Sequence, residues 1–292
     1  MVALSLATVY VVWSTTYLAV RYAVGSRSAA GLPPMSVGGL RYLSAGLVLA
    51  AFARLRGAPL PSRAQWMRTL PLSVLFFVMG NGFVALAERD LDSGVAALVC
   101  GTMPLWGAVL GLAFGDAVRV REWVGLAVGF AGMVALGSGA DLRASPASWA
   151  LLGVAPIAWA MGSVLARRLA LPAGLMAPAA QMIAGGALML ALGAATGERW
   201  PAHAPASAWW AVGYLALMGS LAAFSAYVYL LRNARAPVAM SYAYVNPAAA
   251  VLLAAAMGDA QLRVRTLAAT VLVVVGVVVM VTRKPTPAKS TA

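Results

Sequence analysis

The sequence has little charge for its length, and few of its charges are negative. Charged residues make up 10% of the 292 residues, with 8 acidic side chains against 21 lysines and arginines, whereas 62% of the residues are hydrophobic. Such a composition excludes an ordinary soluble globular domain and places the chain in a bilayer. The basic residues are scattered singly between apolar runs, so they form no stripe of the kind that binds nucleic acid.

Cysteine and histidine are almost absent, which argues against several kinds of catalytic chemistry. The single cysteine, Cys100, lies inside an apolar run and has no partner for an intramolecular disulfide, and the single histidine, His203, falls in a predicted loop. The sequence contains no HExxH motif, no carboxylate pair within a core, no cysteine and histidine partnership and no Walker-type glycine loop. We therefore expect a protein that is not an enzyme and that binds neither a metal nor a cofactor.

Aspartate, glutamate and lysine are also missing near the predicted midplane of the membrane. Intramembrane proton relays are usually built from ionisable residues at that depth. We therefore expect facilitated or weakly coupled movement of a solute rather than a proton-coupled pump.

Ten long apolar segments are what the sequence does contain. About twenty apolar residues cross a hydrocarbon core roughly 30 Å thick, and each segment meets that length approximately. We predict an all-α integral membrane protein with ten transmembrane helices, short connections and a disordered tail at 283–292. The predicted spans are residues 2–24, 34–53, 70–87, 93–114, 123–139, 149–166, 171–195, 209–231, 237–257 and 267–281.

An internal repeat relates the two halves of the chain. Residues 93–117 contain Pro104 and end in Gly-Asp-Ala, and the same pattern returns at 236–260 with Pro247 and a second Gly-Asp-Ala at 258–260. A proline and a three-residue stop at matching positions predict a duplicated unit. We call the alignment that places Pro104 opposite Pro247 the repeat register.

Five spans in each half reverse the second copy in the membrane. Because five is an odd number, the second half starts from the opposite side and is inverted. The predicted repeats are residues 1–139 and 148–282. Lysines and arginines near the span ends number 13 on the side of the termini and 7 on the other side, which predicts that both termini are cytoplasmic.

Aromatic and hydroxyl side chains share one helical face in the first span of each half. Trp13, Thr16 and Tyr17 stand at i, i+3 and i+4, and Trp159 and Ser163 repeat the pattern in the sixth span. These faces either line a substrate pathway or allow close helix packing. The substrate-lining interpretation is the one we follow below.

Further candidates lie in the third, fourth, eighth and ninth spans. Pro104 and Pro247 each remove a backbone donor in mid-span, which predicts a helix kink and a freed carbonyl at both places. Asn81 needs a hydrogen-bond partner in the membrane, either a solute or a neighbouring helix. The full predicted substrate-binding set is Trp13, Thr16, Tyr17, Asn81, Met103, Trp106, Trp159, Ser163, Phe224, Tyr242 and Asn246.

Three charged residues fall at a similar height in the outer third of the first spans. Arg21, Arg41 and Glu88 form either an outer gate that could also hold a substrate carboxylate, or a structural ion pair with arginines that reach toward the interface. The sequence leaves both alternatives open.

Four motifs together resemble the drug/metabolite transporter superfamily, and within it the EamA group, whose five-helix unit occurs twice. The motifs are Val-Tyr-Val-Val-Trp-Ser-Thr-Thr-Tyr at 9–17, Gly-Asn-Gly at 80–82, Met-Pro-Leu-Trp at 103–106 and Ser-Tyr-Ala-Tyr-Val-Asn-Pro at 241–247. The resemblance covers nearly the whole chain. The proline motifs are specific to the family but not to a substrate.

The resemblance implies an exporter in the bacterial inner membrane that works by alternating access through a central cavity. It implies a pathway lined by spans 1, 3, 4, 6, 8 and 9, with spans 5 and 10 in support. Relatives of the YddG type export amino acids, including aromatic ones, so small-molecule metabolites of this kind and the lipid bilayer are the expected partners. The alternatives are an exporter of other small solutes or drugs, a membrane-embedded enzyme and a channel.

Overall fold

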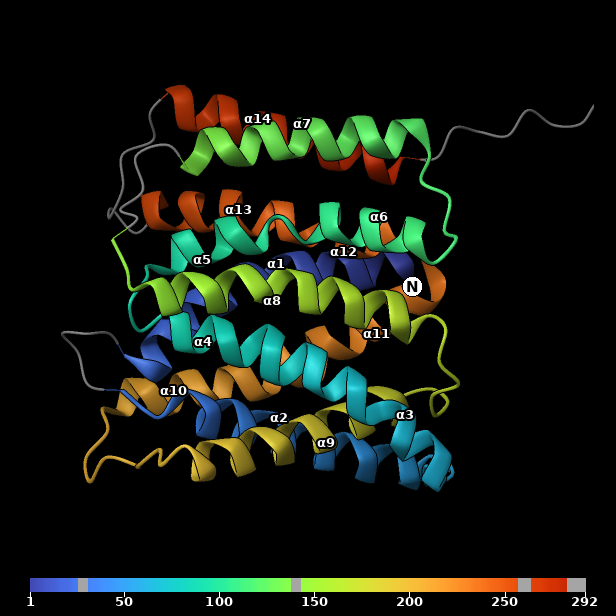
Figure 1. The fold of residues 1–292 in the computed structure, drawn as a ribbon, viewed down its shortest axis with the longest axis vertical. Coiled ribbons are helices and arrows are strands. Elements are labelled where there is room, and N and C mark those ends of the chain that lie inside the picture. Colours follow the sequence, from blue (N-terminus) through green and yellow to red (C-terminus); the bar gives the residue numbers. More distant parts are fainter. Residues whose placement is uncertain (26–30, 138–142, 257–263, 283–292) are drawn as a thin grey trace, which may run out of the picture.

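The chain folds into one bundle of helices that lie side by side (Figure 1). The computed structural model describes residues 1–25, 31–137, 143–256 and 264–282, and within these ranges every regular element is a helix. Eight helical segments of this described part are long and apolar enough to cross a membrane, and a shorter apolar helix covers Thr266–Val281. The predicted all-α membrane fold is confirmed.

The first half begins and ends with simple helices, but its third and fourth spans are composite. The π-helix η1 interrupts the third span, and a two-residue break divides the fourth. The elements are α1 (Val2–Val24), α2 (Pro34–Leu55), α3 (Arg63–Ser73), η1 (Val74–Gly82), α4 (Phe83–Ala87), α5 (Ser93–Cys100), α6 (Met103–Ala113) and α7 (Val120–Gly137).

The second half repeats this order of simple and composite spans. Its eighth span contains the π-helix η2, and its ninth is divided after Met240. The elements are α8 (Pro146–Ala166), α9 (Met176–Ala195), α10 (Ala206–Tyr214), η2 (Leu215–Phe224), α11 (Ser225–Asn233), α12 (Ala236–Met240), α13 (Tyr242–Ala256) and α14 (Val264–Val281). The predicted tail at 283–292 and the second Gly-Asp-Ala at 258–260 lie outside the described residues.

Two span starts differ from the sequence prediction by five residues or more, for local reasons. The third span begins at Arg63 instead of residue 70, because Ser62 and Gln65 exchange hydrogen bonds of 2.9 and 3.2 Å in a capping box. The seventh begins at Met176 instead of residue 171, because the preceding chain turns through Gly174 at a φ of 53°.

The breaks in the fourth and ninth spans lie ahead of the two prolines. The fourth span is interrupted at Gly101 and Thr102, and Pro104 is the second residue of α6, where a missing N–H leaves no helical bond unmade. The ninth span is interrupted at Ser241, and Pro247 lies inside α13.

Opposite directions of the two halves are visible in Figure 1. Helix α1 starts on the side where Met1 lies and α8 starts on the other side, so these equivalent helices run antiparallel. Helix α14 ends on the same side as Met1. We call this the termini side of the bundle and the opposite one the far side.

Equivalent helices pair at both ends of the bundle, α2 with α9 and α7 with α14 (Figure 1). Glycines allow these contacts. A Cβ at Gly186 of α9 would lie 2.4 Å from the backbone nitrogen of Leu43, and one at Gly276 of α14 would lie 2.5 Å from the backbone nitrogen of Gly129. Backbone-to-backbone packing through small residues is typical of membrane helices.

Replacement of Gly186 by valine should therefore destabilise the protein. The new side chain meets backbone atoms that cannot rotate away, and overpacking of this kind costs about 1–3 kcal/mol or more. Thermal unfolding of the purified protein in detergent measures the effect. Gly153→Val is the matched control, because nothing lies within 4 Å of a Cβ at Gly153; equal melting temperatures for the two variants would contradict this account of the helix pair.

Candidate functional site

A cavity with about 630 Å³ of space not filled by protein atoms, its opening to solvent included, lies among helices of both halves. It is lined by α1, α2, η1, α4, α5, α6, α8, η2 and α13. Nine of the eleven predicted substrate-binding residues line it. They are Trp13, Thr16, Tyr17, Asn81, Met103, Trp159, Phe224, Tyr242 and Asn246.

The cavity extends from the middle of the bundle toward the far side. On α1 its lining residues run from Trp13 to Val20, in the half of the helix that leads away from Met1. On the third span they run from Gly80 to Val84, close to the far end of that span. The space therefore occupies the far half of the protein and stops near its centre.

A layer of aromatic rings closes the cavity toward the termini side. The ring of Trp13 lies 4.6 Å from that of Tyr242, 5.1 Å from Tyr227 and 5.4 Å from Trp159, between centroids. These side chains are buried, and Phe76 packs edge-on against Trp159 at 4.9 Å. Edge-to-face contacts of this kind make a rigid apolar floor.

Each of the two tryptophans donates one hydrogen bond and contacts the opposite half of the chain. The indole N–H of Trp13 donates to the carbonyl of Gly219 in η2 at 3.0 Å. The ring of Trp159 lies against Gly80 in η1, where a Cβ would come within 2.9 Å of it, and its N–H donates to the Tyr227 hydroxyl at 3.1 Å. The tryptophan of each half therefore contacts the π-helix of the other half. Trp13 contacts η2, and Trp159 contacts η1.

In both π-helices, a polar side chain donates a hydrogen bond to a backbone carbonyl of the same helix. The amide of Asn81 donates to the carbonyl of Phe76 at 2.9 Å, and the hydroxyl of Ser220 donates to the carbonyl of Leu215 at 3.0 Å, both five residues back along the chain. These side chains satisfy carbonyls within widened turns, and π-helical turns often occur at functional sites. Asn81 thereby keeps its carbonyl oxygen for a second partner.

That partner is Arg41, the charged member of the cavity lining. One terminal nitrogen of its guanidinium donates to the Asn81 oxygen at 3.0 Å and to the Tyr42 hydroxyl, and the guanidinium stands 4.2 Å from the centroid of the Tyr42 ring. The other terminal nitrogen, Nη1, would lie 3.9 Å from a Cβ at Gly219, across the cavity lining. Arg41 is 5% exposed, so its positive charge acts in a poorly solvated space.

Asn246 offers the other polar group that is fixed by the protein. Its side-chain oxygen accepts from the Ser14 hydroxyl at 3.2 Å, and its amide nitrogen is buried with no hydrogen-bond partner among the described residues. An amide donor buried without an acceptor costs free energy. A solute with an acceptor oxygen in the cavity would remove that cost.

Two predicted substrate-binding residues do not line the cavity. Trp106 lies on α6 with 38% of its surface exposed. Ser163 is buried on the termini side of Trp159, where its hydroxyl lies 2.6 Å from that of Tyr227 and donates to the Trp159 carbonyl at 2.7 Å. Ser163 therefore hydrogen-bonds to residues of the aromatic floor on its termini side.

Sequence reasoning missed six lining residues. Most of them carry no distinctive side chain, and Cys100 was considered only as a possible disulfide partner. The missed residues are Val20, Tyr42, Gly80, Val84, Cys100 and Gly219. One usable signal was available: Gly80-Asn81 in the third span and Gly219-Ser220 in the eighth, equivalent spans of the two halves, are both a glycine followed by a polar residue.

The three residues predicted as a possible outer gate have different positions. Arg41 lines the cavity, whereas Arg21 donates to the carbonyl of Glu88 and, at 3.0 Å, to that of Leu91, and pairs with Asp92 at 3.6 Å. Arg21 thus binds carbonyls left free at the end of α4. The side chain of Glu88 is fully buried beside the cavity.

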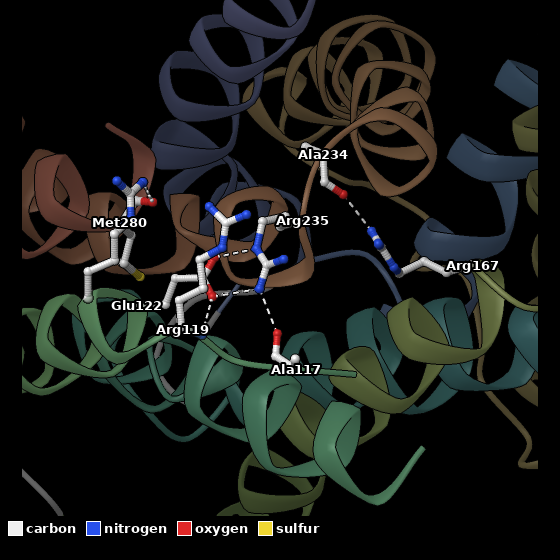
Figure 2. Close-up of polar contacts among 8 residues, drawn as sticks. Ala117, Arg119, Glu122, Arg167, Ala234, Arg235 and Met280 are labelled. Carbon is white, nitrogen blue, oxygen red and sulfur yellow. Dashed lines mark hydrogen bonds and ion pairs between the residues drawn. The ribbon is translucent and has the colours of Figure 1, made fainter. Parts of the chain in front are cut away.

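Arg167 binds backbone carbonyls at a helix end on the termini side, as Arg21 does on the far side. It donates to the carbonyls of Leu231 and Ala234 at 2.8 and 2.5 Å, at the end of α11. In the repeat register these two carbonyls are the equivalents of the pair that Arg21 binds. Figure 2 shows the contact of Arg167 with Ala234. Burial lowers the pKa of Arg167.

An ion pair between the halves closes the termini side (Figure 2). Arg235, just before α12, donates to both carboxylate oxygens of Glu122 on α7 at 2.5 and 2.8 Å, and to the carbonyl of Ala117 at 2.6 Å. The hydrogen bonds to Glu122 raise the pKa of Arg235. Arg168 pairs with Asp116 at 2.8 Å nearby. We refer to the Arg235 and Glu122 pair as the latch.

Behind the latch lies a second pocket, smaller by the same measure, with about 400 Å³ of space not filled by protein atoms, its opening to solvent included. Residues of α6, of α12 and of the segments next to α7, α8 and α12 line it, among them Ala108, Arg167 and Arg235. The same spans contribute to the central cavity. The aromatic floor lies between the two spaces.

Comparisons with known proteins agree with this architecture. Residues 1–138 and 147–282 each match the EamA-like transporter family. A protein of Escherichia coli (strain K12) named "Uncharacterized inner membrane transporter YedA" is 40% identical over 282 residues, which cover 96% of this chain and 90% of that one. The chloroplastic WAT1-related protein At3g02690 of Arabidopsis thaliana is 29% identical over 170 residues, 54% of this chain and 40% of its own. A solved crystal structure aligns with a TM-score of 0.76 at 24% identity over 96% of both chains, a likeness in fold alone.

Proposed function

Because the chain belongs to the EamA-like transporter family, we propose that it exports amino acids, including aromatic ones, through the central cavity. The family and the inner membrane transporter of Escherichia coli support a transporter in the bacterial inner membrane. The observation that favours amino acids is a cavity with aromatic walls and one buried arginine.

Aromatic and polar groups in the cavity complement the two ends of an amino acid. Trp13, Phe224 and Tyr242 offer ring faces and edges to an apolar side chain. Arg41, held by Asn81, offers a guanidinium to the carboxylate, the pairing that gives the strongest hydrogen bonds. The amide of Asn246 provides a further donor.

The lining favours amino acids over cationic drugs. No acidic side chain lines the described cavity, and Arg41 would repel a positively charged solute. Neutral metabolites with a carboxylate or another acceptor group remain the alternative substrates. Competition by a panel of solutes against phenylalanine in vesicles ranks these classes, and saturable exchange distinguishes a carrier from a channel or a membrane enzyme.

Alternating access follows from the two halves, which we assign to residues 1–139 and 148–282. The cavity opens toward the far side, while the aromatic floor and the latch close the termini side. Inverted repeats can exchange conformations, which would open the termini side and close the far side. With both termini in the cytoplasm, as the arginine distribution favours, this conformation faces outward.

The test of the site is the loss of phenylalanine efflux when its aromatic walls are removed. We expect Trp13→Ala and Tyr242→Ala to lower efflux from loaded proteoliposomes at least tenfold, because each deletes contacts with the solute and neighbouring rings. Trp106→Ala removes an equally large ring outside the cavity and serves as the control. Unchanged efflux in both site variants at equal protein levels would refute the site.

A further inference from the structure

Glu88 is a buried acid with no partner for its carboxyl group. The residue follows α4, its side chain is fully buried, and neither carboxyl oxygen has a hydrogen bond within the described part of the chain. It does not line the cavity, but it interacts electrostatically with Tyr17 and Cys100, which do. The carboxyl group therefore lies close to the substrate cavity without lining it.

The neighbouring cations are occupied by other groups. Arg21 and, more weakly, Arg41 attract the carboxyl group of Glu88, yet neither forms an ion pair with it. Arg21 is held by Asp92 and by backbone carbonyls, and Arg41 by Tyr42 and Asn81. A carboxyl group buried without a hydrogen bond or ion pair is stable in its neutral form. In this conformation Glu88 holds a proton.

Among the charged groups near Glu88, Arg41 is the one that can pair with either Glu88 or a solute carboxylate. Helix α1 contributes Tyr17 and Arg21, α2 contributes Arg41, and α5 contributes Cys100. Asp92, just before α5, pairs with Arg21. Helices α8 and η1, which pack on α4, contain no ionisable residue. Arg21 is neutralised by Asp92, so the charge of Arg41 is the one that an ionised Glu88 or a solute carboxylate would neutralise.

We propose that Glu88 is a proton-binding site linked to solute binding through Arg41. This inference rests on the proposed function. One guanidinium neutralises one carboxylate: when Glu88 is ionised it competes for Arg41, and when it takes a proton from water Arg41 is free for the solute. Proton and solute therefore strengthen each other's binding.

Infrared spectra of the purified protein without solute test the proton site. We expect the carbonyl band of a protonated buried carboxylic acid at neutral pH in the wild type, its loss in Glu88→Gln, and its retention in Asp116→Asn. Asp116 is the control because it is an acid on the opposite side of the bundle that pairs with Arg168 at 2.8 Å. Arg41→Gln should keep the band to higher pH. A band that persists in Glu88→Gln overturns the proposal.

Phenylalanine binding tests the linkage between about pH 5 and 8, where phenylalanine itself stays zwitterionic. Wild-type affinity should stay constant while Glu88 is protonated and fall by up to about tenfold per unit once Glu88 ionises, while Glu88→Gln, which resembles the protonated form, keeps the high affinity at every pH. Equal pH dependence in both proteins overturns the linkage. If phenylalanine does not bind at all, the proposed substrate class is wrong, and the infrared spectra still decide whether Glu88 holds the proton.

Discussion

Phenylalanine should bind at least about 30-fold more weakly when Arg41 is replaced by glutamine, while phenylethylamine, which lacks the carboxylate, should bind as well as before or better. The guanidinium is 5% exposed and its Nη1 atom faces the cavity. Removal of one member of a buried, hydrogen-bonded charge pair costs about 2–5 kcal/mol, and about 1.4 kcal/mol is a factor of ten in affinity. Equilibrium binding of both labelled compounds to purified protein measures the difference.

Two further variants distinguish a loss of carboxylate recognition from a loss of folding stability. Arg41→Lys keeps the charge but loses the planar fork, so it should show an intermediate loss. Arg21→Gln removes an arginine at a similar height that does not line the cavity, so it should lower the melting temperature and leave phenylalanine affinity unchanged. Equal losses for phenylalanine and phenylethylamine in Arg41→Gln would show that the guanidinium does not bind the carboxylate.

Helical periodicity was sufficient to predict most of the substrate-binding candidates that line the cavity. Trp13, Thr16 and Tyr17 are expected on one face by their spacing, and all three reach the cavity. Periodicity gives the face of a helix but not the depth at which a cavity ends. Ser163 shares the face of Trp159 yet lies one turn deeper, below the aromatic floor.

Helix interruptions explain the other differences between prediction and structure. The break at Gly101 and Thr102 resets the helical register of α6, and Trp106 turns outward. The π-helices leave the apolar pattern of the third and eighth spans unchanged, so hydropathy does not reveal them. Burial without a partner is a tertiary property, so the sequence left Glu88 as a member of either an outer gate or a structural ion pair.

The two sides of the bundle are equivalent in their backbone but not in their charges. Arg21 and Arg167 bind equivalent carbonyls, yet the repeat register places Arg235 opposite Asp92. Alignment of the first residues of α7 and α14 places Thr266 opposite Glu122. The latch on the termini side thus has an aspartate and a threonine as its counterpart in sequence, and these two residues cannot form an ion pair. In the proposed alternating-access cycle, this asymmetry would favour the conformation that is open to the far side.

Replacement of Glu122 by glutamine should therefore shift the protein toward the conformation that is open on the termini side. Glu122 is 1% exposed and accepts two hydrogen bonds from Arg235. Hydrogen bonds to charged groups contribute about 1.5–3 kcal/mol each, so the equilibrium between the two conformations should change at least tenfold. In transport, the variant should exchange solute but release it more slowly on the far side.

Single cysteines in a Cys100→Ala background report the shift. Val20→Cys lies in the cavity, and Ala108→Cys lies in the smaller pocket behind the latch, where the residue is 1% exposed. With a membrane-impermeant thiol reagent on each side of vesicles of known orientation, Glu122→Gln should label more slowly at position 20 from the far side and faster at position 108 from the termini side. Asp116→Asn, which breaks the more exposed pair with Arg168, should change both rates less. If Glu122→Gln leaves both rates unchanged, the ion pair is not what holds the termini side shut, and closure rests on the aromatic floor alone.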